Sequence, residues 1–253
     1  MPKYIFSINS GRCGSAYLAK LFAETGNTIS FHEAEPVCNG KEMRNYLMSK
    51  PGAMKTLSSD KASIIRNGTP SGYTYVDTSH LFIKGFGWYL PDILGEENIG
   101  VVIIRRDPVE TAASFLRIGC TPLSQKGRDW IITPEAQFEW LKRCPPFGLL
   151  KGKRAYLAAR LCKYFQPFLK NTGISTLCDL IDEYERMSTI WYIESVYQLA
   201  EVFQNKFPHI TYYETSLSQL NSIDHVNQMY SVMGCQALPS LADIIGQPQN
   251  TKI

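Results

Sequence analysis

The chain of 253 residues is long enough for one sizeable domain, and its 44% hydrophobic and 19% charged residues are ordinary for a globular protein. The net charge of only +3 gives no reason to expect nucleic acid or a membrane as a partner. No apolar run approaches the ~18–20 residues that a membrane span needs, and we expect no signal peptide.

Strand and helix patterns alternate along the first half of the chain. Short apolar runs rich in β-branched and aromatic residues predict strands at 3–8, 28–31, 73–76 and 100–104. Helical periodicity predicts helices at 15–26, 40–50, 53–66 and 108–118. We expect Gly26 to end the first of these helices, and Asp107 to cap the last one with Pro108 in its first turn.

The second half of the chain is predicted to be mainly helical. Helices are expected at 154–170, 185–206 and 222–233, with a last strand at 209–214. The complete pattern predicts an α/β fold with a central parallel sheet of about five strands flanked by helices. We expect a single domain over 1–253, with an α/β core at 1–119, a variable and largely helical region at 120–184, and a completing segment at 185–253.

Four polar clusters each follow a predicted strand. They are NSGRCGS (9–15), HEAEP (32–36), DTSH (77–80) and RRDP (105–108). The carboxyl ends of parallel strands meet at one edge of a sheet, and ligands bind there. The four clusters therefore predict the rim of an active site.

The first cluster is typical of a phosphate-binding turn. A Gly/Ser turn between a strand and a helix presents backbone N–H groups to an anion. It is not a Walker A loop because no lysine follows the last glycine, so Arg12 would supply the cation. A plain glycine-rich turn with a solvated arginine is the alternative interpretation.

The fourth cluster suits a second anion. Ser114 lies eight residues after Arg106, and Ser114 and Arg117 share the helix face that begins at Asp107. The alternative is a capped amphipathic helix with exposed arginines.

Taken together, SGRCGSAYL and VVIIRRDPVETAASFLR resemble the two cofactor-binding motifs of the P-loop-like sulfotransferases. The segment HITYYETSLSQL is similar to a late strand of that family. The resemblance covers 1–31 and 73–118, and more weakly 185–235. It implies a transferase that moves a sulfuryl group from 3′-phosphoadenosine-5′-phosphosulfate (PAPS) to a hydroxyl, or to an amine or guanidine nitrogen, of a small metabolite or natural product. The nucleotide product is 3′-phosphoadenosine-5′-phosphate (PAP).

The resemblance also implies roles for individual residues. Arg12 would neutralise the leaving 5′-phosphate, Arg106 and Ser114 would hold the 3′-phosphate, and Tyr17 would lie near the adenine. Ala16 departs from the family by lacking a hydroxyl, and Lys252 would replace the family's C-terminal closing motif. The residues expected at the cofactor are Gly11, Arg12, Cys13, Gly14, Ser15, Ala16, Tyr17, Arg106, Ser114 and Lys252.

Two residues are candidates for the general base of this reaction. His80 matches the position of the catalytic histidine in cytosolic relatives, and an imidazole pKa near 6.5 suits a base at neutral pH. Glu33 lies where the tyrosine-sulfating branch carries a catalytic glutamate. We rank His80 first and Glu33 second, with Asp77 orienting a neighbour or contacting the acceptor.

Two other functions remain open. A small-molecule kinase would need Mg²⁺, and Asp77 could imitate its acidic metal ligand, but the missing GK[ST] motif argues against it. A non-catalytic nucleotide-binding protein would keep both anion sites without a base. The sulfotransferase interpretation requires a small-molecule acceptor as partner and no metal. It leaves the oligomeric state open, with a homodimer possible. Seven scattered cysteines with no C-x-x-C spacing predict reduced thiols and a cytoplasmic location.

Overall fold

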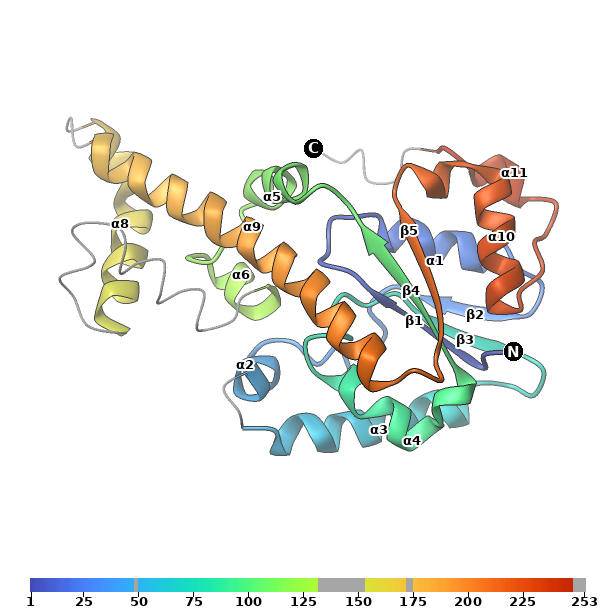
Figure 1. The fold of residues 1–253 in the computed structure, drawn as a ribbon. Coiled ribbons are helices and arrows are strands. Elements are labelled where there is room, and N and C mark those ends of the chain that lie inside the picture. Colours follow the sequence, from blue (N-terminus) through green and yellow to red (C-terminus); the bar gives the residue numbers. More distant parts are fainter. Residues whose placement is uncertain (48–49, 132–152, 172–174, 248–253) are drawn as a thin grey trace. The chain divides into compact units, whose positions relative to one another are not determined.

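The computed structural model describes residues 1–47, 50–131, 153–171 and 175–247 (Figure 1). The chain separates into two compact units. Unit 1 comprises Met1–Cys38, Lys50–Arg106 and Val196–Ile253, and unit 2 comprises Asn39–Ser49 and Asp107–Ser195. Residues 107–119, which the sequence places with the α/β core, thus belong to unit 2.

Unit 1 is built on a five-stranded sheet in which every neighbouring pair is parallel. The strands are β1 (Tyr4–Ile8), β2 (Thr28–Phe31), β3 (Thr74–Asp77), β4 (Ile99–Arg105) and β5 (Thr211–Ser216). The predicted fold class is therefore confirmed. The last strand begins two residues later than predicted, because the backbone of Ile210 still closes a turn onto Phe207.

The strand order is β2-β3-β1-β4-β5. After β1 the chain builds β2 and β3 on one side, and it then crosses over to build β4 and β5 on the other side. The loops that leave β1 and β4 therefore diverge at the centre of the sheet. Open α/β sheets bind their ligands at the carboxyl ends of the strands where the strand order reverses in this way.

Helices cover both faces of this sheet in unit 1 (Figure 1). One face packs against α1 (Ser15–Ala23), α10 (Ile223–Met233) and α11 (Leu241–Ile244), whose buried apolar side chains form one core cluster with those of the strands. The other face carries α3 (Gly52–Gly68) and α4 (Leu90–Leu94). Its core is aromatic, with Phe82 stacked on Phe6 at 5.0 Å between ring centroids.

The first helix ends earlier than the sequence predicts. It stops at Ala23, and Gly26 is not its C-cap, so that expectation is wrong. The hydroxyl of Thr25 donates to the carbonyl oxygen of Phe22 at 2.9 Å, and Thr25 then forms a β-bridge with Ala237. These two contacts satisfy the end of the helix before the glycine is reached.

Unit 2 is helical. It contains α2 (Lys41–Leu47), α5 (Pro108–Arg117), α6 (Gln125–Trp130), α8 (Lys153–Asn171) and the part of α9 (Ser175–Lys206) that precedes Val196. Asp107 caps α5 as predicted, because its Oδ1 accepts from the backbone N–H of Glu110 at 2.9 Å. Helix α9 begins ten residues before its predicted start. Its additional turns carry the buried side chains of Ile181 and Tyr184.

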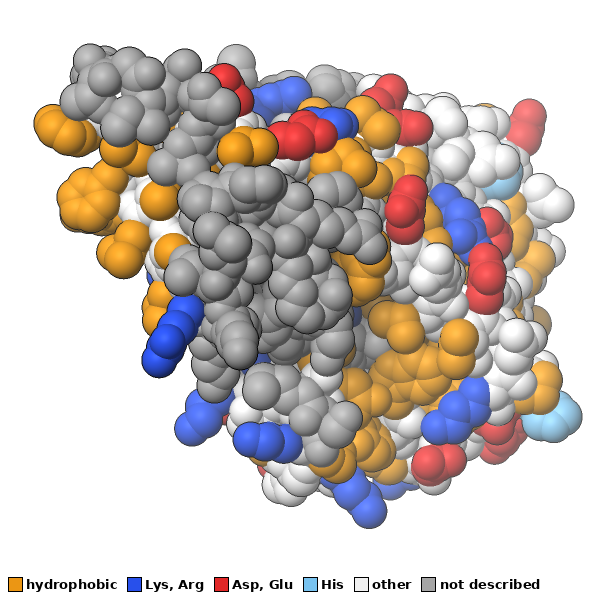
Figure 2. Space-filling model, turned by 60° about the vertical axis from the view of Figure 1, so that its left-hand side comes forward, with side chains coloured by type: hydrophobic (Ala, Val, Ile, Leu, Met, Phe, Trp, Pro, Cys, Tyr) orange, Lys and Arg blue, Asp and Glu red, His pale blue; other side chains and the backbone are white. Residues whose placement is uncertain are grey.

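Hydrophobic patches lie among charged side chains on the surface that Figure 2 shows. Among the described residues, α8 exposes five large apolar side chains at helical spacing, namely Leu157, Leu161, Tyr164, Phe165 and Phe168. Within the described ranges, no helix is both long enough and apolar enough to cross a bilayer. The six described cysteines are all free thiols.

Candidate functional site

The loop after β1 is a tight turn with an internal set of hydrogen bonds. Gly11, Arg12 and Gly14 all have positive φ angles, of 84°, 56° and 103°. The side chain of Asn9 braces the turn: its Oδ1 accepts from the backbone N–H of Gly11 at 2.9 Å, and its Nδ2 donates to Oγ of Ser7 at 2.7 Å. Consecutive residues in such conformations form a concave backbone of the kind that binds anions.

This loop leads directly into the N-terminus of α1. Gly14 occupies the N-cap position and supplies no side-chain hydrogen bond, and the first turn carries no acidic residue. The N–H groups at the start of the helix are therefore not capped by a side chain, and the helix dipole adds positive potential there. A Cβ atom on Gly14 would lie 2.7 Å from Cδ1 of Leu217. Both this close approach and the positive φ angle favour glycine at this position.

Arg106 joins the loop after β4 to the loop after β1. Its Nη1 donates to the carbonyl oxygen of Arg12 at 3.1 Å. The hydroxyl of Tyr197 accepts from the backbone N–H of Arg106 and donates to its carbonyl oxygen, both at 2.9 Å. Two predicted site arginines therefore meet where the strand order reverses, and a tyrosine that the sequence did not reveal holds one of them.

Four further residues expected at the cofactor need separate comment. Cys13 and Tyr17 point into the core of unit 1, and the hydroxyl of Tyr17 accepts from the backbone N–H of Gly246 at 3.0 Å. Burial raises the pKa of the Cys13 thiol to about 11, so only its backbone is suited to an anion. Ser114 lies on α5 in unit 2, and Lys252 lies outside the described residues. Their cofactor contacts, and that of Tyr17, stay predictions.

The two candidate bases are neighbours. Nε2 of His80 lies 3.3 Å from Oε1 of Glu33. His80 is buried, whereas the Glu33 side chain is 24% exposed. Nε2 of His32 lies 3.8 Å from the same Glu33 oxygen. Both close contacts involve Oε1 of Glu33, and among the described residues Oε2 has no hydrogen bond or ion pair.

Lys84 decides how His80 uses its two ring nitrogens. Nζ of Lys84 lies 2.6 Å from Nδ1 of His80. An ammonium group can only donate, so Nδ1 must carry the lone pair and Nε2 the proton. Burial, and then electrostatic interactions with Lys84 and His32, hold the pKa of His80 well below its usual range, which keeps the ring neutral. His80 therefore carries its proton on Nε2, the nitrogen 3.3 Å from Glu33, and has no lone pair left to take a proton from a substrate.

Asp77, which the sequence offered as a residue that orients a neighbour or contacts the acceptor, binds the loops that carry this pair. It is fully buried and forms an ion pair with Lys61 at 2.9 Å. Its Oδ1 accepts from the backbone N–H groups of Ala34 and Ser79, at 3.3 and 3.1 Å. Asp77 therefore orients both loops that carry the candidate bases.

Four residues of this site were missed by reasoning from the sequence: Asn9, Lys61, Lys84 and Tyr197. Asn9 lies inside the first motif, and Lys84 lies four residues after His80, so local signals existed for these two. Lys61 and Tyr197 come from other helices, 16 residues before Asp77 and 91 residues after Arg106, and carry no local signal.

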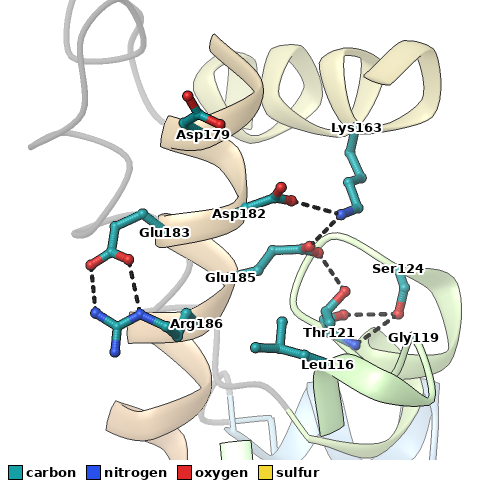
Figure 3. A pocket seen from close by; sticks show the side chains of 10 residues that line it. All are labelled: Leu116, Gly119, Thr121, Ser124, Lys163, Asp179, Asp182, Glu183, Glu185 and Arg186. Atoms are coloured by element: carbon teal, nitrogen blue, oxygen red, sulfur yellow. Dashed lines mark hydrogen bonds and ion pairs between the residues drawn. The ribbon is translucent and has the colours of Figure 1, made fainter. Parts of the chain in front are cut away.

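Unit 2 contains a separate pocket of about 550 Å³ (Figure 3). Its charged lining is largely paired internally. Lys163 lies 2.8 Å from Oε2 of the buried Glu185 and 3.3 Å from Oδ1 of Asp182, while Arg186 donates to Glu183 at 2.7 and 2.9 Å. The lining holds four carboxylates, of Asp179, Asp182, Glu183 and Glu185, but only two cations, Lys163 and Arg186, so the pocket keeps an excess of negative charge. The described parts of the chain hold no group of three or more His, Cys, Asp or Glu residues arranged for a metal ion.

Comparisons with known proteins were made on both sequence and structure. No protein-family model matches the sequence, and no curated protein matches it significantly. Among solved structures, the chain is similar to the crystal structure of a sulfotransferase from Alicyclobacillus acidocaldarius, with 11% sequence identity and a TM-score of 0.47. The match covers 96% of this chain and 89% of that chain. A likeness of this degree assigns no function.

Proposed function

We propose that the protein is a sulfotransferase that uses PAPS and acts on a hydroxyl or nitrogen group of a small acceptor. One observation carries this proposal. An uncapped glycine-rich turn, an arginine that contacts it from the neighbouring strand, and a carboxylate paired with a neutral histidine all lie at the carboxyl edge of one parallel sheet. These are the parts needed to hold a phosphorylated leaving group and to deprotonate an acceptor.

The residues around the first loop fit the phosphosulfate end of the cofactor. The three positive φ angles and the uncapped helix start supply backbone donors, and Arg12 supplies charge. Arg12 would stabilise the negative charge that develops on the departing 5′-phosphate. Arg106 with Ser114 would bind the 3′-phosphate, as the sequence motif implies.

We assign the role of general base to Glu33 rather than to His80. PAPS supplies the sulfuryl group, and PAP leaves with the electrons of the broken sulfur–oxygen bond. As the acceptor oxygen or nitrogen bonds to sulfur, its proton passes to Oε2 of Glu33. In this role His80 presents its Nε2–H to Oε1, 3.3 Å away, and thereby orients the carboxylate.

The kinase alternative requires Asp77 as an acidic ligand of Mg²⁺. Asp77 is fully buried and already ion-paired with Lys61. A carboxylate in that position is poorly suited to bind Mg²⁺ beside a nucleotide. We propose no metal for this reaction.

The test is a calorimetric titration with PAP, run beside ATP with Mg²⁺. We expect PAP to bind without metal, and Arg106→Ala to weaken that binding at least about tenfold by removing a charge-assisted contact. Arg66→Ala, an exposed arginine on α3, is the control with the same loss of charge. Tight Mg²⁺-dependent ATP binding with no PAP binding would overturn the proposal.

A further inference from the structure

Two fully buried charges lie beneath the loops that carry Glu33 and His80. Lys61, on α3, places Nζ 2.9 Å from Oδ2 of Asp77, which ends β3. The exposed fractions of the two side chains are only 1% and 0%. Removing two charges from water is unfavourable, and replacing such a pair with apolar residues is often neutral or stabilising. Stability therefore does not explain why this buried ion pair is present.

Both partners also bind the backbone of the loop after β2. Nζ of Lys61 donates to the carbonyl oxygens of Ala34 at 2.6 Å and Pro36 at 3.2 Å. Oδ1 of Asp77 accepts from the N–H of Ala34 at 3.3 Å. Ala34, the residue directly after Glu33, is therefore held through its N–H by one member of the pair and through its carbonyl by the other.

Asp77 holds the second loop at the same time. The same Oδ1 accepts from the N–H of Ser79 at 3.1 Å, one residue before His80. A single ion pair thus fixes the residue after Glu33 and the residue before His80. The two functional side chains come from segments 47 residues apart in the chain, and this pair joins them.

Glu33 needs such support because its backbone is strained. Its φ angle is 60°, in the left-handed region that L-residues other than glycine seldom adopt. Conformations of this kind persist only where the surroundings determine them, and they concentrate at functional sites. The hydrogen bonds to the N–H and carbonyl of Ala34 hold the backbone in place on the C-terminal side of Glu33.

We propose that Lys61 and Asp77 are positioning residues whose buried ion pair holds Glu33 against His80 for proton transfer. This inference rests on the proposed function, in which Glu33 takes the acceptor proton. A pair that served stability alone would have no effect on the geometry of His80 or on turnover once the protein was folded.

The test removes both charges together in Lys61→Met/Asp77→Asn, so that neither is left buried and alone. Lys55→Met, an exposed lysine on the same helix, is the matched control. The first readout is the nitrogen-15 NMR spectrum of labelled histidine in the protein without cofactor. It reports which His80 nitrogen carries the proton, and His80→Gln assigns the signal. The second readout is sulfuryl transfer from labelled PAPS to a panel of alcohols, phenols and amines, together with PAP affinity.

We expect the wild type and Lys55→Met to show His80 protonated at Nε2 only. In the double variant this signal should become a mixture of tautomers, and turnover should fall about tenfold to a hundredfold while PAP affinity changes little. If the double variant does not fold, Asp77→Asn alone is measured, because its amide oxygen can still accept from Ala34 and Ser79. A variant that folds and keeps both the His80 signal and the wild-type turnover would overturn the inference.

The spectrum separates the two proposals. A wild type that binds no PAP and transfers no sulfuryl group refutes the proposed function, and with it the catalytic meaning of the pair, whatever the spectrum shows. A wild type that is active, combined with a double variant of unchanged spectrum and activity, refutes only the positioning role.

Discussion

Nε2 of His80 lies 3.3 Å from Oε1 of Glu33, so the two residues that the sequence offered as alternative bases are direct neighbours. The ammonium group of Lys84, 2.6 Å from Nδ1, places the ring proton of His80 on Nε2. The imidazole consequently faces the carboxylate with an N–H group, and Glu33 is the member of the pair that can accept a further proton.

This arrangement predicts unequal effects of two substitutions. Glu33→Gln should lower turnover about 10²–10³-fold, because it removes the base but keeps the side-chain shape. His80→Gln should lower turnover by only about tenfold, because a glutamine N–H can still donate to Glu33. Both are measured with saturating PAPS, with PAP affinity determined beside them. Glu35→Gln, in the same loop, is the control. An active Glu33→Gln with an inactive His80→Gln would return the role of base to His80.

The burial of a neutral His80 predicts a pH-dependent stability. The pKa of His80 lies well below its value near 6.5 in an unfolded chain, so below about pH 6.5 the unfolded state binds a proton that the folded state does not. The free energy of unfolding should therefore fall as the pH falls, by at most about 1.4 kcal/mol for each pH unit, until the folded-state pKa is reached.

Urea unfolding at several values between about pH 7.5 and pH 5.5 measures this slope. The His80→Gln variant has no titrating group at position 80. Its free energy of unfolding should therefore fall less steeply with pH across the same range. Equal slopes in the wild type and the variant would show that His80 is protonated equally in both states.

Tyr197 should support the site through Arg106. Tyr197→Phe removes the hydroxyl that binds both the N–H and the carbonyl of Arg106, which should lower the free energy of unfolding by about 1–2 kcal/mol and weaken PAP binding several-fold. Tyr212→Phe is a matched control, because its hydroxyl donates to the carbonyl of Phe207 at 2.9 Å, away from the site. That control should lose stability without losing PAP affinity. An equal loss of affinity in both variants would contradict a specific role for Tyr197.

Gly14 should tolerate no side chain. Gly14→Ala places a Cβ 2.7 Å from Leu217 at a φ of 103°, so it should destabilise the fold by about 2 kcal/mol or more and disturb the anion-binding turn. Gly72→Ala is the comparison, because Gly72 also has a positive φ, of 84°, but no atom near its Cβ position. Gly72→Ala should lower the free energy of unfolding by only about 1 kcal/mol, through backbone strain alone. Chemical denaturation and PAP titration measure both effects, and equal losses in the two variants would show that the Leu217 contact is unimportant.

The sequence by itself determined the α/β class, the approximate positions of the strands, and the loops at which the polar clusters lie. Apolar runs and helical periodicity are local signals, and the cap formed by Asp107 on Glu110 spans only three residues. Parallel pairing then requires that the loops after all the strands meet at one edge. For this reason the glycine-rich turn, Glu33, His80 and Arg106 could be identified from the order of residues alone.

Only the tertiary structure decided which of these residues touch and which nitrogen of His80 carries the proton. Lys61 reaches Asp77 from a helix 16 residues earlier in the chain, and Tyr197 reaches Arg106 across 91 residues. The sequence around a buried lysine does not distinguish it from a solvated one. The roles of Glu33 and His80 depend on Lys84, because hydrogen-bond direction follows from three-dimensional contacts. Burial and pairing are properties of the packed chain, and the packed chain therefore determines the chemistry of the site.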